Sequence, residues 1–356
     1  MEAIKRKREI KALTRDELTK AVLEMGQPKF RVKQLISWLF EKHVHDFDEM
    51  TNLPAAMRDS LKENYTLNIP TEKVKQVSKD GSRKYLLEFE DGTCVETVGM
   101  PNGSKLSVCV STQAGCRMGC VFCATGQAGF TRSLSAGEIY DQVMHVAEDF
   151  GSRVTSVVFM GQGEPFANYD NVLCALRWLN AEDAAGIGAR HLTVSTCGIL
   201  PAIRKFAEEP EQFTLAISLH SAVQETRNQI MPGVKKYTLE RLHETMEAYT
   251  EKTGRRPSYE FALIAGMNDT EPEIDALVSF AEGTLSHVNL IQLNDTPGSP
   301  LKPSTEAKAT KIINRLAQHG VEATVRNSRG NDIDAACGQL TQKMRTIEHP
   351  SKRTII

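Results

Sequence analysis

The sequence predicts an α/β protein built around a partly open parallel barrel of about six β/α units, preceded by a small helical domain and a β-hairpin linker. Strand-like and helix-like segments alternate from Lys105 onward, as in parallel sheets with crossover helices. Helical periodicity dominates up to about Pro70, and an Asp91-Gly92 pair between two β-rich runs indicates a hairpin. We therefore divide the chain into residues 1–70, 71–104, 105–340 and a tail, 341–356.

The N-terminal domain is predicted to hold helices over residues 15–23, 31–42 and 55–65. The second has Val32, Leu35 and Leu39 on one apolar face, so we expect this domain to have a minor core of its own. Residues 84–89 and 93–98 should form the hairpin strands.

The barrel domain contains apolar runs that predict strands over residues 106–111, 154–160, 191–195, 213–218, 259–263, 288–292 and 323–326. Between them, helical spacing predicts helices over 169–179, 200–208, 239–253, 271–282 and 306–319. A further helix should begin at Ser135, which forms a capping-box pattern with Glu138. Fewer than eight units imply a barrel that does not close.

Composition indicates a soluble globular protein, with 40% hydrophobic and 25% charged residues among 356. No apolar run follows the basic start and none is long enough to span a membrane, so we expect a cytoplasmic protein without membrane contact. In that compartment its eight cysteines favour metal ligands and reactive thiols over disulfides. The net charge of -2 does not suggest a nucleic-acid binder, and the lysine and arginine clusters taken alone are typical of a solvated surface.

Three cysteines, Cys116, Cys120 and Cys123, follow the first barrel strand with C-x3-C-x2-C spacing. Cysteines this close together favour a metal. Structural zinc takes four protein ligands, for which Cys109 is the candidate fourth, whereas a four-iron cluster held by three thiolates leaves one iron open. The spacing resembles that of radical S-adenosylmethionine (SAM) enzymes, whose open iron is chelated by SAM.

Glycine-rich residues 161–165 follow the second barrel strand and resemble the SAM-binding element of the same enzymes. The glycines allow close backbone approach, and Glu164 offers a counter-charge to an ammonium group; an ordinary βα turn is the alternative. Other polar residues lie at strand ends, where helix capping is the simpler interpretation. The resemblance instead assigns these positions to the SAM site: Gly163, Glu164, Ser195, Ser218, Leu219, His220 and Asn294.

Cys109, the three-cysteine loop and a distant segment around Cys337 together resemble the RlmN/Cfr family of radical-SAM RNA adenine methyltransferases, from about Phe30 to Leu340. The resemblance implies a radical-SAM type of partial barrel, a [4Fe-4S] cluster on the three-cysteine loop, two SAM molecules per turnover and Glu96 as general base. Cys337 would carry a methyl group taken from the first SAM. A radical made from the second would join that group to an adenine ring carbon, and Cys109 would release the product by forming a disulfide with Cys337. Cys94, Cys174 and Cys197 match no family position, and we expect them to be buried free thiols.

The resemblance implies RNA substrates, namely an adenosine in large-subunit ribosomal RNA and adenosine 37 of certain transfer RNAs, with N-terminal helices that bind RNA. It also implies a reducing electron donor such as flavodoxin, and we predict no stable protein partner. Pro165 after Glu164 favours methylation at adenine C2. Gln162 and residues 293–295 depart from the common family pattern, which leaves the adenosyl pocket less defined. Two alternatives stay open: methylation at C8, and a non-catalytic RNA-binding protein with structural zinc.

Overall fold

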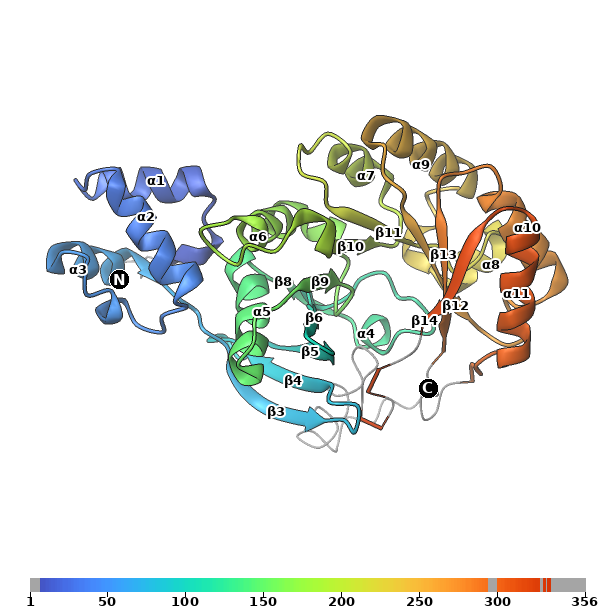
Figure 1. The fold of residues 1–356 in the computed structure, drawn as a ribbon, viewed down its shortest axis with the longest axis horizontal. Helices are drawn as coiled ribbons and strands as arrows, with labels where there is room; N and C mark the ends of the chain where they lie inside the picture. The colour runs from blue at the N-terminus through green and yellow to red at the C-terminus, as the bar shows by residue number, and fades with distance from the viewer. Residues whose placement is uncertain (1–6, 294–299, 327–328, 331, 334–356) are drawn as a thin grey trace, which may run out of the picture.

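A computed structural model describes residues 7–293, 300–326, 329–330 and 332–333. Its centre is a ten-stranded sheet in the order β14-β13-β12-β11-β10-β9-β6-β5-β4-β3 (Figure 1). The parallel part comprises β6 (Lys105–Cys109), β9 (Ser156–Phe159), β10 (Leu192–Thr196), β11 (Thr214–Ser218), β12 (Ser258–Leu263), β13 (His287–Gln292) and β14 (Glu322–Arg326). All of the predicted barrel strands are therefore present.

Helices connect each parallel strand to the next: α5 (Ala136–Phe150), α6 (Tyr169–Asn180), α7 (Leu200–Phe206), α9 (Leu239–Thr253), α10 (Glu271–Ala281) and α11 (Glu306–Gln318). The predicted capping box of α5 is formed, because Ser135 accepts a bond from Glu138 N and the Glu138 side chain accepts one from Ser135 N. The helices cover the outside of the curved sheet (Figure 1). The described residues thus form six β/α units followed by the strand β14, which confirms the predicted partial barrel.

The N-terminal domain contains α1 (Arg15–Glu24), α2 (Phe30–Ile36) and α3 (Ala55–Asn64), with a π-helical turn, Ser37–Glu41, continuing α2. A short parallel pair, β1 (Arg8–Glu9) and β2 (Tyr65–Thr66), was not predicted. The expectation of a separate minor core is wrong, because the apolar residues of this domain belong to the same cluster as the barrel core. Phe40 stacks on Trp178 of α6 with ring centroids 4.0 Å apart. This contact joins the N-terminal domain to the barrel core.

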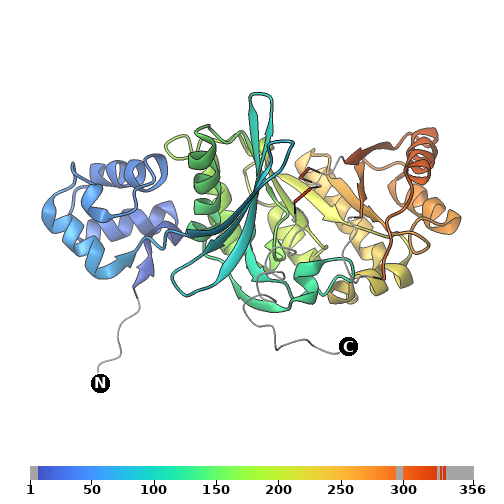
Figure 2. The same cartoon turned by 90° about the horizontal axis from the view of Figure 1, so that it is seen from below.

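The predicted hairpin is present as β4 (Arg83–Glu88) and β5 (Cys94–Asn102), turning at Gly92 with φ +77°. A third strand, β3 (Thr71–Val77), pairs with β4, and β5 pairs antiparallel with β6. This region therefore extends the main sheet, and Figure 2 shows its strands crossing between the N-terminal helices and the barrel.

Short elements that the sequence did not predict surround the three-cysteine loop. They are β7 (Gln113–Gly115), α4 (Ala124–Gln127), β8 (Phe130–Ser133) and α8 (Gln224–Ile230). β7 and β8 form a separate two-stranded sheet. Over the described residues, no helix combines the length and apolarity needed to cross a membrane.

Candidate functional site

A cavity of about 320 Å³ lies at the carboxyl ends of the parallel strands, the position at which parallel barrels bind ligands. It is of the size typical for small-molecule sites. Most of the predicted cofactor-site residues line it: Cys116, Cys120, Cys123, Gly163, Glu164, Ser195, Ser218 and His220.

The cysteine loop, residues 116–123, is held on both sides by backbone hydrogen bonds. Cys116 N donates to Gly129 O at 2.8 Å, and Val121 N donates to Ile230 O at 3.0 Å. Gly233 is required beside the loop, since a Cβ there would lie 2.6 Å from Met118 Cα. The loop is thus fixed before any ligand binds.

The three thiols suit a multinuclear cluster better than one zinc ion. Burial raises the pKa of Cys116 to about 11 and also raises the pKa of Cys120, so bound cationic metal is needed to hold them as thiolates. Structural zinc takes four protein ligands. Cys109, the candidate fourth ligand, does not line this cavity, so the loop offers three thiolates.

Glu164 anchors the glycine-rich turn. Its carboxylate accepts hydrogen bonds from Thr196 Oγ1 at 2.7 Å and Cys197 N at 2.8 Å, which tie the turn after β9 to the end of β10. Burial raises the pKa of Glu164, and these hydrogen bonds oppose the rise. Gly163, with φ +104°, lies directly against Gln113.

His220 presents a neutral imidazole to the cavity. Ala262 N donates to His220 Nδ1 at 3.0 Å, so the ring proton is on Nε2. Burial and the nearby Arg227 cation lower the pKa of His220 to about 3. The residue has φ +55°, an uncommon conformation for a non-glycine residue at the end of a strand.

Two buried groups that the sequence did not single out contribute unpaired polar atoms. Glu260 lines the cavity, and its Oε2 has no hydrogen-bond partner among the described residues. Arg227 of α8 donates to Cys197 O at 2.8 Å, while its Nε is unpartnered within the same described part. Burial lowers the pKa of Arg227, and the Cys197 and Cys120 sulfurs favour its charge. The unpaired oxygen of Glu260 indicates a polar or charged ligand in the cavity, which Arg227 does not line.

Glu96 and Cys109 lie on the sheet face opposite α5, which we call the inner face. A Cβ on Gly99 would meet Phe150 and Val146 of α5, so the neighbouring Val98 faces inward. Val98 pairs with Cys109, which places Cys109 on the inner face. Glu96, two residues from Val98, shares that face and binds Lys84 Nζ at 2.8 Å.

The inner face continues into the cavity. Cys109 pairs with Val158 of β9, and Met160, two residues further along that chain segment, lines the cavity. Glu96 and Cys109 themselves do not line it. They therefore lie beside the cofactor cavity, on the same side of the sheet.

The remaining predicted residues differ in placement. Leu219 is buried in the core between Ser218 and His220 and does not line the cavity. Asn294 and Cys337 lie outside the described residues. Cys174 and Cys197 are buried as expected, although Cys197 lines the cavity, whereas Cys94 is partly exposed and the expectation of burial is wrong there.

Comparison with known proteins agrees with this geometry. Residues 110–281 match the model of the radical SAM superfamily, and residues 9–67 match that of the ribosomal RNA large subunit methyltransferase N-terminal domain. A Staphylococcus aureus (strain JH9) protein named probable dual-specificity RNA methyltransferase RlmN is 44% identical over 345 residues, 96% of this chain and 95% of the relative. The protein of the same name from strain NCTC 8325 is equally similar.

A solved structure supports the assignment along most of the chain. The crystal structure of a radical SAM methyltransferase from Sphaerobacter thermophilus has a TM-score of 0.88 and 39% identity, covering 93% of this chain and 98% of the other. Because similarity of this strength spans both the barrel and the N-terminal helices, the chain belongs to the RlmN family of the radical SAM superfamily.

Proposed function

We propose that this protein is a radical SAM methyltransferase that methylates C2 of an adenosine in large-subunit ribosomal RNA and in transfer RNA, using a methyl group carried on Cys337. The observation that supports it best is the convergence of three cysteines with Glu164, Ser195 and His220 on one cavity. The name of the similar Staphylococcus aureus protein specifies RNA, and the description of the matched N-terminal domain specifies ribosomal RNA. The choice of an adenosine in each RNA is part of our proposal.

The cavity fits a [4Fe-4S] cluster and SAM. The three cysteines would supply the thiolates, and a cluster so held keeps one iron for an exogenous ligand. When bound, the cluster and SAM supply the radical chemistry that an electron-poor adenine ring carbon requires, given an electron donor of the flavodoxin type.

The polar groups around the cavity would orient SAM. The Nε2 proton of His220 can donate to a carboxylate or ribose oxygen, since Nδ1 is occupied by Ala262 N. The unpaired Oε2 of Glu260 can accept from a hydroxyl or amino group. Gly163 lets the ligand approach the backbone at the turn that Glu164 holds in place.

The inner face would carry the methyl-transfer residues. Glu96 would act as the general base, with Lys84 holding its carboxylate at 2.8 Å. Cys109 would attack the sulfur of Cys337 in the RNA adduct and form a disulfide, breaking the bond from that sulfur to the methylene carbon. The methylene carbon would keep the bonding electrons and take up a proton, which leaves a methyl group on the adenine.

The chain that leads to Cys337 is anchored near this face. Asp332 accepts hydrogen bonds from the Ser78 hydroxyl and, at 3.0 Å, from Lys79 N, in the turn between β3 and β4. Cys337 is five positions further, a reach of up to about 18 Å. One register row across the neighbouring strands β4, β5 and β6 contains Lys84, Val98 and Cys109, and it spans about 10 Å. The extended length of the chain from Asp332 to Cys337 is thus greater than the width of this row.

Pro165, which follows Glu164, favours C2 over C8 methylation. The test is mass spectrometry of nucleosides from ribosomal and transfer RNA after anaerobic incubation with the iron-loaded protein, SAM and reductant. We expect 2-methyladenosine in both RNAs. Formation of 8-methyladenosine would establish the C8 alternative, and protein that stays colourless after reconstitution with iron and sulfide would favour the zinc alternative.

Cysteine variants test the carrier scheme. Cys337→Ala should yield no methylated RNA while keeping its cluster, and Cys109→Ala should accumulate a covalent protein–RNA adduct on denaturing gels. The buried Cys174, which contacts the N-terminal segment, serves as the matched control and should behave as wild type when replaced by alanine. A normal yield of free methyladenosine from Cys109→Ala would exclude its resolving role.

A further inference from the structure

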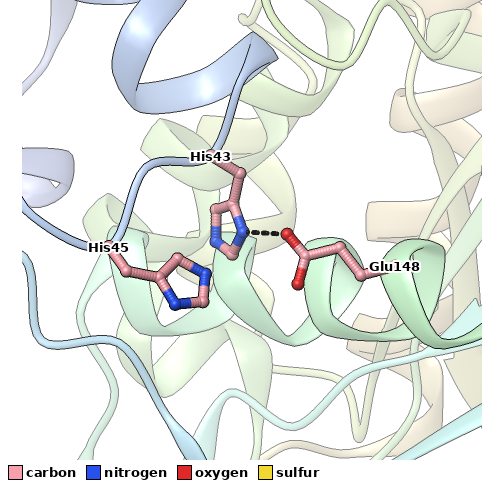
Figure 3. A group of neighbouring side chains, drawn as sticks. All are labelled: His43, His45 and Glu148. Atoms are coloured by element: carbon pink, nitrogen blue, oxygen red, sulfur yellow. Dashed lines mark hydrogen bonds and ion pairs between the residues drawn. The ribbon is translucent and has the colours of Figure 1, made fainter. Parts of the chain in front are cut away.

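Three potential metal ligands meet where the N-terminal domain rests on α5, away from the cysteine loop. They are His43 and His45, in the loop after the π-helical turn, and Glu148 of α5 (Figure 3). One ligand atom from each lies within 4.8 Å of the other two. His43 is buried, whereas His45 and Glu148 are exposed, so an ion would reach the group from solvent.

His43 is held in a single orientation. Its Nε2 lies 3.0 Å from Asp141 Oδ1. Its Nδ1 lies 2.7 Å from Glu148 Oε1 (Figure 3). Asp141 is fully buried and paired with Lys11, so it remains a carboxylate and keeps a proton on Nε2. Nδ1–H donates to Glu148, and this is the proton that a metal ion bound at Nδ1 would replace. A carboxylate behind one imidazole nitrogen is the common support for a histidine that binds metal through the other.

The backbone of His43 is also strained. Its φ is +50°, which non-glycine residues adopt at a cost of about 1–3 kcal/mol. This conformation turns His43 and His45 toward each other, with ring centroids 5.4 Å apart and planes at 82°. Strain of this kind is typical of functional sites, where the surrounding structure maintains it.

We propose that His43, His45 and Glu148 bind a divalent transition-metal ion, zinc being the best match, which fastens the N-terminal domain to α5. Two imidazoles and one carboxylate form a common zinc donor set that leaves a fourth position for water. Tetrahedral ligand atoms at zinc lie about 3.3 Å apart, so Glu148 Oε1 must move away from Nδ1 by only about 0.6 Å. Its side chain is 47% exposed and has room to do so.

The site has a path to solvent. His45 lines a polar cleft of about 1030 Å³ between the N-terminal domain and the barrel, which also includes Lys7, Lys62 and Arg132. An ion held at the rim of this cleft would set the angle between the domain and α5. The proposal does not depend on the proposed function, because none of its residues belongs to the cofactor cavity.

The test measures zinc uptake by the full chain after reconstitution with iron and sulfide, which occupies the cysteine loop. Equilibrium dialysis with elemental analysis should show one additional zinc per chain in wild type. The affinity should be at least about tenfold weaker in His45→Ala and in Glu148→Gln. His145→Ala, one turn away on the same helix, is the matched control and should bind zinc as wild type does.

Two readouts besides stoichiometry complete the test. X-ray absorption at the zinc edge should show nitrogen and oxygen ligands without sulfur, and zinc should raise the unfolding temperature of wild type but not of His45→Ala. Because His45 is exposed, its replacement should leave the fold intact. Equal zinc uptake by wild type and His45→Ala, or sulfur in the coordination shell, would overturn the proposal.

Discussion

Replacing Gly163 by alanine tests why this position of the turn requires glycine. We attribute the requirement to close packing against Gln113 as well as to the positive φ. A Cβ at this position would lie 2.6 Å from Gln113 Cβ and 2.8 Å from Gln113 N, so the backbone itself would have to move. Strain at φ +104° costs about 1–3 kcal/mol, and overpacking adds about 1–3 kcal/mol. We therefore expect Gly163→Ala to lower the free energy of unfolding by about 2–6 kcal/mol.

The same change should also weaken SAM binding. Gln113 Oε1 accepts a hydrogen bond from Glu164 N at 2.9 Å, so displacing Gln113 shifts Glu164 away from Thr196 and Cys197. The assays are denaturant unfolding and calorimetric titration with SAM under anaerobic conditions. Gly92→Ala is the matched control, since Gly92 has φ +77° but nothing within 4 Å of a Cβ, and it should lose only about 1–2 kcal/mol. Equal stability and equal SAM affinity of the two variants would refute the reasoning.

Three further predictions concern buried polar groups. Glu260→Gln should keep the iron–sulfur chromophore but weaken SAM binding about tenfold in calorimetry, because we propose that the unpaired Oε2 accepts a hydrogen bond from SAM; unchanged affinity would contradict this. The pKa of His220, about 3, lies below its value in the unfolded chain, so the neutral ring stabilises the fold above pH 6.5 and this stabilisation is lost as the pH falls. The free energy of unfolding of wild type should drop by up to about 2 kcal/mol at pH 5. Denaturant unfolding of His220→Gln should not show this drop. Lys84→Met should cost about 3–5 kcal/mol because it removes the cation paired with the buried Glu96 side chain, and adding Glu96→Gln should restore part of that loss; additive costs would refute the coupling.

Most of the cofactor site could be predicted because its residues follow strands. Glu164 and His220 come directly after apolar runs, and the carboxyl ends of parallel strands meet at one edge of the sheet. The spacing of the three cysteines allowed a cluster to be proposed before any geometry was known. These signals are local in sequence, and the parallel topology converts them into proximity.

The roles of Glu260 and Arg227 at the site could not be predicted, because one lies inside a strand and the other on a helix. Glu260 lies within an apolar strand, where a single carboxylate is typical of a solvent-facing position, yet barrel curvature turns it into the cavity. Arg227 lies on α8, which carries several polar residues and so resembles a surface helix. Its burial beside Cys197 depends on how that helix packs across the ends of β10 and β11.

The antiparallel extension determines on which face of the sheet the proposed methyl-transfer residues, Glu96 and Cys109, lie. Side chains alternate along a strand, so a slip of one residue between β5 and β6 would turn Cys109 toward α5 while Val98 stayed inward. The packing of Gly99 against Phe150 keeps β5 in place, because any larger residue at position 99 would collide with the ring. Val108, which pairs with Gly99 and is buried, opposes a slip of β6, because the slip would turn its side chain away from α5. These two positions therefore keep Cys109 and Glu96 on the inner face, beside Met160 and the cavity. The segment predicted as a linker thus lies beside the candidate active site.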